Sequence, residues 1–162
     1  MYTFFFLLIT FMAILVHLLL TKQPKTKKIV LEIILMYFLV FTVGLGGISS
    51  FMGHIFMGTE IAKSIGWPSG NPFQFEVGVA YLAFGILGLL CIKLKRGFWL
   101  ATGLGSIIFY YGAALGHIKD MLTNHNYAAY NSDSLLYVGD ILVPSIILVL
   151  LITYVVTFKK RT

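Results

Sequence analysis

Charged residues are scarce in this chain. Asp, Glu, Lys and Arg make up 11% of the 162 residues, whereas 59% are hydrophobic. A water-soluble domain usually carries about 25% charged residues. The composition therefore excludes an ordinary soluble domain and predicts a protein that has lipid as its main solvent.

Cysteine is also scarce, and recognised cofactor motifs are missing. The single cysteine, Cys91, excludes an intrachain disulfide and a cysteine-rich metal site. No HExxH, CxxC or CxxCH motif occurs. The sequence therefore specifies neither a metal, a haem nor a quinone as cofactor, and it leaves all three open.

The basic residues do not form the stripe that a nucleic acid would need. The formal net charge is +6, but ten of the twelve basic residues gather at the ends of apolar runs. Anchoring at a cytoplasmic membrane surface explains this pattern, and we expect no nucleic-acid partner. The ten are Lys22, Lys25, Lys27, Lys28, Lys93, Lys95, Arg96, Lys159, Lys160 and Arg161.

Five apolar runs are long enough to cross a bilayer, which takes about 20 helical residues. They cover about 2–21, 29–55, 75–94, 97–119 and 134–158. We expect one all-α domain over residues 1–162, a five-helix multi-pass bundle in the cell (plasma) membrane. The positive-inside rule puts the N-terminus outside and the C-terminus in the cytoplasm. Residues 2–21 lack a secretory cleavage signal and are expected to be retained.

Two of the runs have special features. The second is too long for a straight span, and the glycine and serine cluster within residues 44–53 is a candidate kink. A short interfacial helix is expected between the second and third runs, within 56–74. Gly46 with Ser50, and Gly112 with Gly116, are small pairs four apart that favour close helix packing. Such glycine-rich faces would pack helices together within the monomer, or would bind a second copy of the chain or another membrane protein.

Acidic and histidine side chains gather at the end opposite to the cations. Ionisable groups at membrane depth usually face protein or a water-filled cavity. We expect four of them to form an outward-facing pocket and to carry any catalysis: His54, Glu76, His117 and Asp140. If a metal binds, His54 and His117 would hold it. Further pocket residues are expected to be Glu60, Trp67, Tyr110, Asp120 and Tyr137. A structural polar network and solvated helix ends are the alternatives.

Several segments carry a family resemblance. Residues 53–56 and 65–78, with 98–102 and the Gly-His-Ile of 116–118, resemble an uncharacterised family of small multi-pass prokaryotic membrane proteins. More loosely, the chain is similar to DoxX-like proteins, which have four membrane helices and of which some are linked to quinone redox chemistry. The first resemblance implies no particular activity, and the second adds a quinone as one possible cofactor.

The sequence favours a pocket for a small molecule or cofactor, in a membrane redox enzyme or isomerase. A small transporter or channel is an alternative, although it needs a polar path to both faces and the inner halves of the runs offer few polar residues. An accessory subunit of a membrane complex is another.

Overall fold

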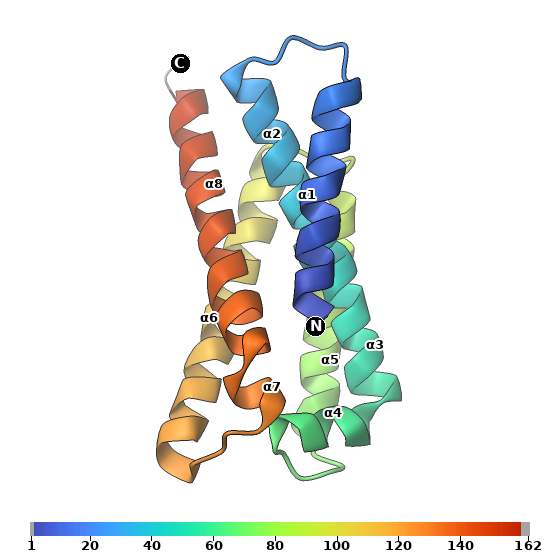
Figure 1. Ribbon diagram of the computed structural model, residues 1–162, viewed down its shortest axis with the longest axis vertical. Helices are drawn as coiled ribbons and strands as arrows, with labels where there is room; N and C mark the ends of the chain where they lie inside the picture. Colours follow the sequence, from blue (N-terminus) through green and yellow to red (C-terminus); the bar gives the residue numbers. More distant parts are fainter. Residues whose placement is uncertain (1, 160–162) are drawn as a thin grey trace.

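The computed structural model describes the backbone of residues 2–159 and the side chains of residues 3–157. The predicted tail cations Lys160 and Arg161 lie outside the described residues, and so does the side chain of Lys159. Every regular element in the described range is helical (Figure 1). In chain order these are α1 (Tyr2–Leu20), α2 (Lys27–Tyr37), η1 (Phe38–Leu45), α3 (Gly46–Phe56), α4 (Gly58–Ile65), α5 (Pro72–Leu90), α6 (Gly97–Asn124), α7 (Ala129–Ser132), η2 (Leu135–Leu142) and α8 (Val143–Lys159).

Five helical stretches of the described chain are long and apolar enough to cross a membrane. They are Thr3–Leu20, Lys27–Phe56, Pro72–Leu90, Gly97–Asn124 and Leu135–Thr157. The prediction of an all-helical bundle with five such helices is confirmed. Two boundaries differ from it: α5 ends at Leu90, before a turn that runs to Arg96, and α6 continues past residue 119 to Asn124.

Two of the long helices contain π-helical turns. The second runs without a break through α2, η1 and α3, and the fifth begins as η2 before it becomes α8. A kink was expected within residues 44–53, but the irregular segment is η1, which ends at Leu45, and the backbone from Gly46 to Phe56 is regular α-helix. π-helix makes up well under 1% of residues in proteins, and its turns occur frequently at functional sites.

Glycines bring α5 against η1 and α3. A Cβ added to Gly47 would lie 2.8 Å from the carbonyl oxygen of Tyr81 and 2.9 Å from the amide nitrogen of Gly85. Gly44 and Gly88 also face each other: a Cβ added to Gly44 would lie 3.1 Å from the carbonyl carbon of Gly88, and one added to Gly88 would come closer still to the backbone of Gly44. Gly46 was expected on a close-packing face, but a Cβ added to it would meet only the carbonyl oxygen of Phe41 in the same long helix, at 3.6 Å.

The buried core surrounds α2 and η1, in which Leu35, Leu39 and Val43 are fully buried. Cys91 belongs to this core, and its carbonyl oxygen accepts a 2.8 Å hydrogen bond from the indole nitrogen of Trp99. Helix α1 packs along one side and leaves much of its apolar surface exposed.

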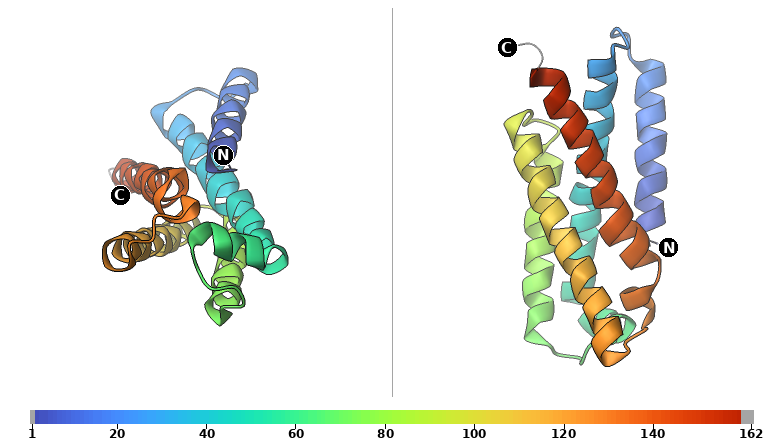
Figure 2. Two further views of the ribbon diagram at one scale, coloured as in Figure 1. Left: turned by 60° about the horizontal axis from the view of Figure 1, so that its bottom comes forward. Right: turned by 90° about the vertical axis from the view of Figure 1, so that its left-hand side faces the viewer.

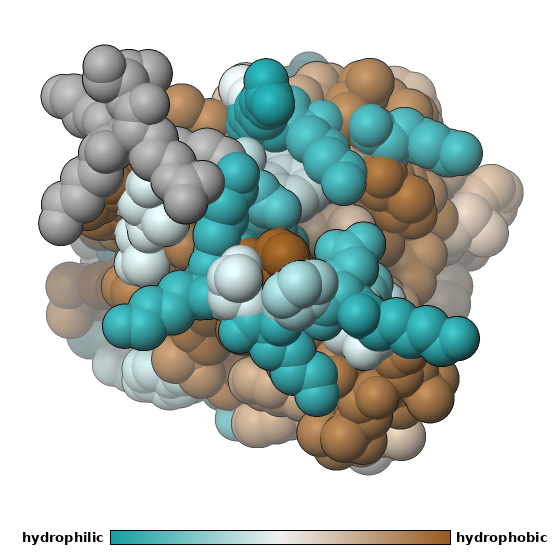
Figure 3. All heavy atoms as spheres, turned by 90° about the horizontal axis from the view of Figure 1, so that it is seen from above, coloured by the Kyte–Doolittle hydropathy of each residue, from teal (hydrophilic) through white to brown (hydrophobic). Residues whose placement is uncertain are grey.

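The two ends of the bundle differ in chemistry. The α1–α2 loop and the α5–α6 turn lie at the same end, and Figure 3 shows hydrophilic side chains gathered there. The described cations at this end are Lys22, Lys25, Lys27, Lys28, Lys93, Lys95 and Arg96. At the opposite end, α4, α7 and their loops lie across the bundle (Figure 2). The expected short helix between the second and third long helices is α4.

Candidate functional site

A cavity of about 470 Å³ lies near the end of the bundle that carries α4 and α7. Its lining comes from α3, α4, α5, α6, α7 and η2, together with the loop that holds Trp67. Most of the lining is apolar or aromatic. The polar exceptions are His54, Tyr81, His117, Asn131 and Asp140. A mostly apolar cavity of this size with a few convergent polar groups is typical of a small-molecule site.

Asp140 is the most deeply buried acidic residue that the structure describes, and it lies on η2. Only 3% of its surface is exposed. Its Oδ2 lies 3.8 Å from Nε2 of His117, which is too long for a direct hydrogen bond. A water molecule or a ligand group placed between the two atoms would bridge them.

Asn131 determines which nitrogen of His117 carries a hydrogen. Its Nδ2 donates to the carbonyl oxygen of Asn126 at 2.5 Å, so its Oδ1 faces His117. That oxygen lies 2.6 Å from Nδ1 of His117 and can only accept. Nδ1 therefore carries the hydrogen, and Nε2 faces Asp140 either as an acceptor or, in the imidazolium form, as a second donor.

His54 is held differently. Its ring stacks on Tyr81, with centroids 5.7 Å apart and planes 16° from parallel. The buried Nδ1 of His54 has no hydrogen-bond partner among the described residues. Leaving such a group unsatisfied costs about 1–3 kcal/mol. His54 is therefore positioned by aromatic packing, whereas His117 is positioned by hydrogen bonding.

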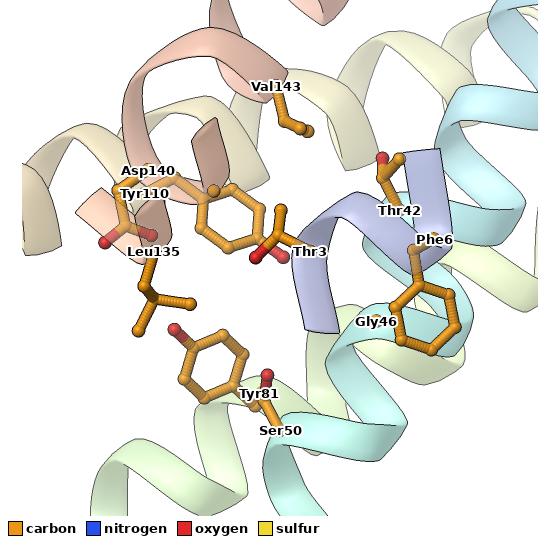
Figure 4. Close-up of a pocket in the computed structure, with 11 residues that line it drawn as sticks. Thr3, Phe6, Thr42, Gly46, Ser50, Tyr81, Tyr110, Leu135, Asp140 and Val143 are labelled. Atoms are coloured by element: carbon orange, nitrogen blue, oxygen red, sulfur yellow. The ribbon is translucent and has the colours of Figure 1, made fainter. Parts of the chain in front are cut away.

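A second, smaller cavity of about 40 Å³ adjoins the first. Figure 4 shows Asp140 and Tyr110 on one side of it and Thr3, Tyr81 and Ser50 around it. Tyr81, Leu135 and Asp140 line both cavities. The volume is enough for a water molecule, and η1 and η2 both contribute to the wall. Asp140 thus lies where the two cavities meet.

The structure brings only part of the predicted site together. His54, His117, Asp140 and Trp67 line the larger cavity, and Tyr110 lines the smaller one. Glu76 does not join them, because it is exposed on the first turns of α5. Two residues earlier, about 200° around the helix, Gln74 is buried and donates a 2.6 Å hydrogen bond to the carbonyl of Gly58.

Three predicted pocket residues also lie elsewhere. Glu60 is exposed on α4, and Tyr137 is 59% exposed on η2. Asp120 accepts 2.6 Å hydrogen bonds from the side-chain amides of Asn124 and Asn126. Asp120 therefore stabilises the loop after α6, and it lines neither cavity.

A metal bound by His54 and His117 would need a third ligand, and the part of the chain that the structure describes offers none. No group of three or more His, Cys, Asp or Glu side chains is close enough together there to hold a metal ion. His54 and His117 face the same cavity without a further ligand of these types beside both of them.

Sequence reasoning missed the asparagines of this site. Asn131 bonds to His117, and Asn126 donates from Nδ2 to the carbonyl of Ile65 at 2.8 Å, which joins the α6–α7 loop to α4. In the sequence, the only indication of these asparagines was that they lie in a polar segment between two apolar runs. Gly112 and Gly116 were expected to make a packing seam, but they line the cavity instead.

The comparisons with known proteins assign a family. No curated protein and no solved structure matches the chain. Nothing in the comparisons supports the looser DoxX-like resemblance. A family model described as a family of unknown function (DUF6790) matches residues 1–159. The chain therefore belongs to this family of unknown function, DUF6790.

Proposed function

We propose that this is a multi-pass membrane protein that binds a small molecule in its 470 Å³ cavity and exchanges a proton with it through His117 and Asp140. The five long apolar helices support the membrane location. The cations at one end support a cytoplasmic position for that end. The cavity then opens on the outer half of the protein.

The arrangement of His117 and Asp140 is the observation that carries this proposal. With Nδ1 protonated, the neutral pair is either imidazole with carboxylic acid or imidazolium with carboxylate. Both forms contain the same number of protons, so a group that bridges the 3.8 Å between Nε2 and Oδ2 would allow one proton to pass from one atom to the other. The neutral pair avoids a lone charge in an apolar interior, which is expensive.

A bound hydroxyl or carbonyl group would complete the site. A hydroxyl placed between Nε2 and Oδ2 accepts a hydrogen bond from one and donates to the other, whereas a carbonyl oxygen there accepts from whichever of the two carries the proton. General acid–base chemistry of this kind serves an isomerase directly. It also serves a redox enzyme, in which a separate reactant would supply or remove the electrons.

Native mass spectrometry of the purified protein tests the binding. We expect a retained small molecule in the wild type and roughly ten- to hundredfold weaker binding in Asp140→Asn, seen as a loss of occupancy, since a hydrogen bond to a charged group is worth about 1.5–3 kcal/mol. Glu76→Gln is the matched control, because Glu76 is an exposed acid at the same end of the bundle. Equal occupancy in Asp140→Asn and the wild type would contradict the proposal.

A proton pathway is the second candidate. It is favoured by the position of Asp140 between the larger cavity and the hydroxyl-lined smaller one. The wild type in proteoliposomes should then conduct protons faster than Asp140→Asn. Indistinguishable flux would remove this candidate and leave the binding function standing.

A further inference from the structure

Helices α5 and α6 separate as they approach the cavity. They are joined by a tight turn at the basic end and diverge towards the other end, as both side views show (Figures 1 and 2). Val77 and Tyr81 of α5 and Ile108, Gly112 and Gly116 of α6 line the cavity from the two sides of this gap. The gap therefore leads into the cavity.

On α6, this side of the gap carries no side chain at Gly112 and Gly116. A Cβ added to Gly112 or to Gly116 would meet no heavy atom within 4 Å. Both glycines are exposed, and Ile108, one helical turn earlier, is 66% exposed although it lines the cavity. Residues that are exposed and also line a cavity mark its mouth. The mouth therefore opens sideways, between α5 and α6.

Most exposed side chains around this mouth are apolar, and the exposed charged residues Glu76 and Lys119 lie towards the end of the bundle that carries α4. Leu115 is 68% exposed beside the two glycines, and Leu104 is exposed two turns before Gly112. Phe75 and Val79 are exposed on α5. On a membrane protein these side chains face acyl chains, so the mouth opens towards the bilayer interior.

We propose that the ligand is a membrane-soluble amphiphile that enters between α5 and α6. Its single hydrogen-bonding head lies against His117 and Asp140, and its apolar tail leaves over Gly112 and Gly116. This inference rests on the proposed binding function and adds the ligand class and the entry route to it. The apolar lining suits the tail, and the buried His117–Asp140 pair suits one polar head.

A second copy of the chain is the competing occupant of this glycine face. Helix dimers that use GxxxG bring two backbones into contact over a closed surface. Here the glycines lie over an open cavity, and the bulky exposed Ile108 and Leu115 flank them. The geometry therefore fits a flexible acyl chain better than a second helix.

Photolabelling in liposomes tests the entry route. The probe is a long-chain alkanol with a mid-chain diazirine, and adducts are mapped by peptide mass spectrometry. Adducts on Leu8 and Leu15, which are exposed on α1, report general labelling by lipid. In the wild type we expect additional adducts on cavity residues such as Phe109 and Ala113.

The variant that closes the mouth is the double substitution Gly112→Leu with Gly116→Leu. We expect cavity adducts to fall about tenfold, with Leu8 and Leu15 adducts unchanged. The matched control is Gly112→Ala with Gly116→Ala, for which the structure leaves room and which should label like the wild type. Unchanged cavity labelling in the leucine variant would overturn the lateral route.

Two further arms separate this inference from the binding function. The first uses a short-chain, water-soluble alkanol diazirine beside the long-chain probe. If only the short-chain probe labels the cavity, and its labelling depends on Asp140, the amphiphile is overturned and the binding function stands. Long-chain labelling that is unaffected by Asp140→Asn but lost in the leucine variant keeps the route and overturns the role of the head group. A dimer that only the leucine variant abolishes assigns the glycines to a contact between copies and overturns the route.

Discussion

At the scale of single residues, the site depends on how few polar groups share the cavity. Asp140 and His117 face each other across 3.8 Å, and Asn131 fixes the histidine tautomer. The acids at the same end that sequence reasoning grouped with Asp140 lie elsewhere: Glu76 is exposed, and Asp120 bonds to asparagines. Burial, and not acidity alone, separates the candidate site from the helix ends.

Asn131→Leu should destabilise the protein and disturb the site. The substitution removes the acceptor at Nδ1 of His117 and the donor to the carbonyl of Asn126, and each buried unsatisfied group costs about 1–3 kcal/mol. Thermal unfolding in detergent measures the loss. Asn124→Ala is the control, since Asn124 is exposed and bonds only to Asp120 among the described residues. Equal stability of the two variants would contradict the network.

Cys91 should resist alkylation in the folded protein. It has no exposed surface and packs in the core beside Trp99. A maleimide should therefore react with it at least about a hundredfold more slowly in detergent than after denaturation, because reaction requires local unfolding of about 3 kcal/mol or more. Intact-mass spectrometry follows the reaction. Rapid labelling of the folded chain would show that this core is open.

At the scale of elements, the two π-helical segments and the glycine seam shape the bundle. η1 and η2 both reach the smaller cavity, with Thr42 from η1 and Asp140 from η2. Tight packing of α5 on η1 and α3 contrasts with the open surroundings of Gly112 and Gly116 on α6. Glycines on different helices therefore have different roles, close helix packing in one case and an open cavity wall in the other, although their spacing in the sequence is similar.

Gly47→Ala and Gly112→Ala form a matched pair that tests this contrast. The methyl group at residue 47 would meet the backbone of α5 at 2.8 Å and 2.9 Å, so we expect a loss of about 1–3 kcal/mol. The methyl group at residue 112 meets nothing within 4 Å, so the higher helix propensity of alanine should leave stability unchanged or raise it by up to about 1 kcal/mol.

Melting temperatures of the two variants and the wild type, measured under identical conditions, test these two expectations. The expected order is Gly47→Ala lowest, then the wild type, with Gly112→Ala equal to it or higher. A destabilised Gly112→Ala variant would mean that another surface covers this glycine.

At the scale of the whole molecule, charge asymmetry predicts how the bundle sits in a membrane. Seven of the nine lysine and arginine side chains that the structure describes gather at one end, and the candidate site lies near the other end, where Lys63 and Lys119 are the other two. Under the proposed orientation, an impermeant maleimide applied to intact cells should label Ser69→Cys, in the exposed loop after α4, but not Lys25→Cys, in the α1–α2 loop.

Permeabilised cells provide the control, because both variants should then be labelled. Buried Cys91 keeps the background low. Labelling of Lys25→Cys in intact cells would reverse the orientation and place the cavity on the cytoplasmic side.

The sequence by itself determined the helical class, the five long apolar helices and the separation of cations from histidines and acids. These features follow from local composition, because an apolar run of bilayer length must satisfy its backbone hydrogen bonds within a helix. It also placed His54 and His117 at similar depth, with Asp140 deeper than the other acids at that end.

Only the tertiary structure decided which of those groups meet. Rotation of each helix about its axis, set by the π turns and by glycine contacts between α3 and α5, buries Asp140 and leaves Glu76 and Tyr137 exposed. A shift of one residue turns a side chain by about 100°, which run lengths and charge counts do not specify. The same packing leaves Gly112 and Gly116 uncovered at the mouth of the cavity, since α5 packs on α3 and away from this part of α6.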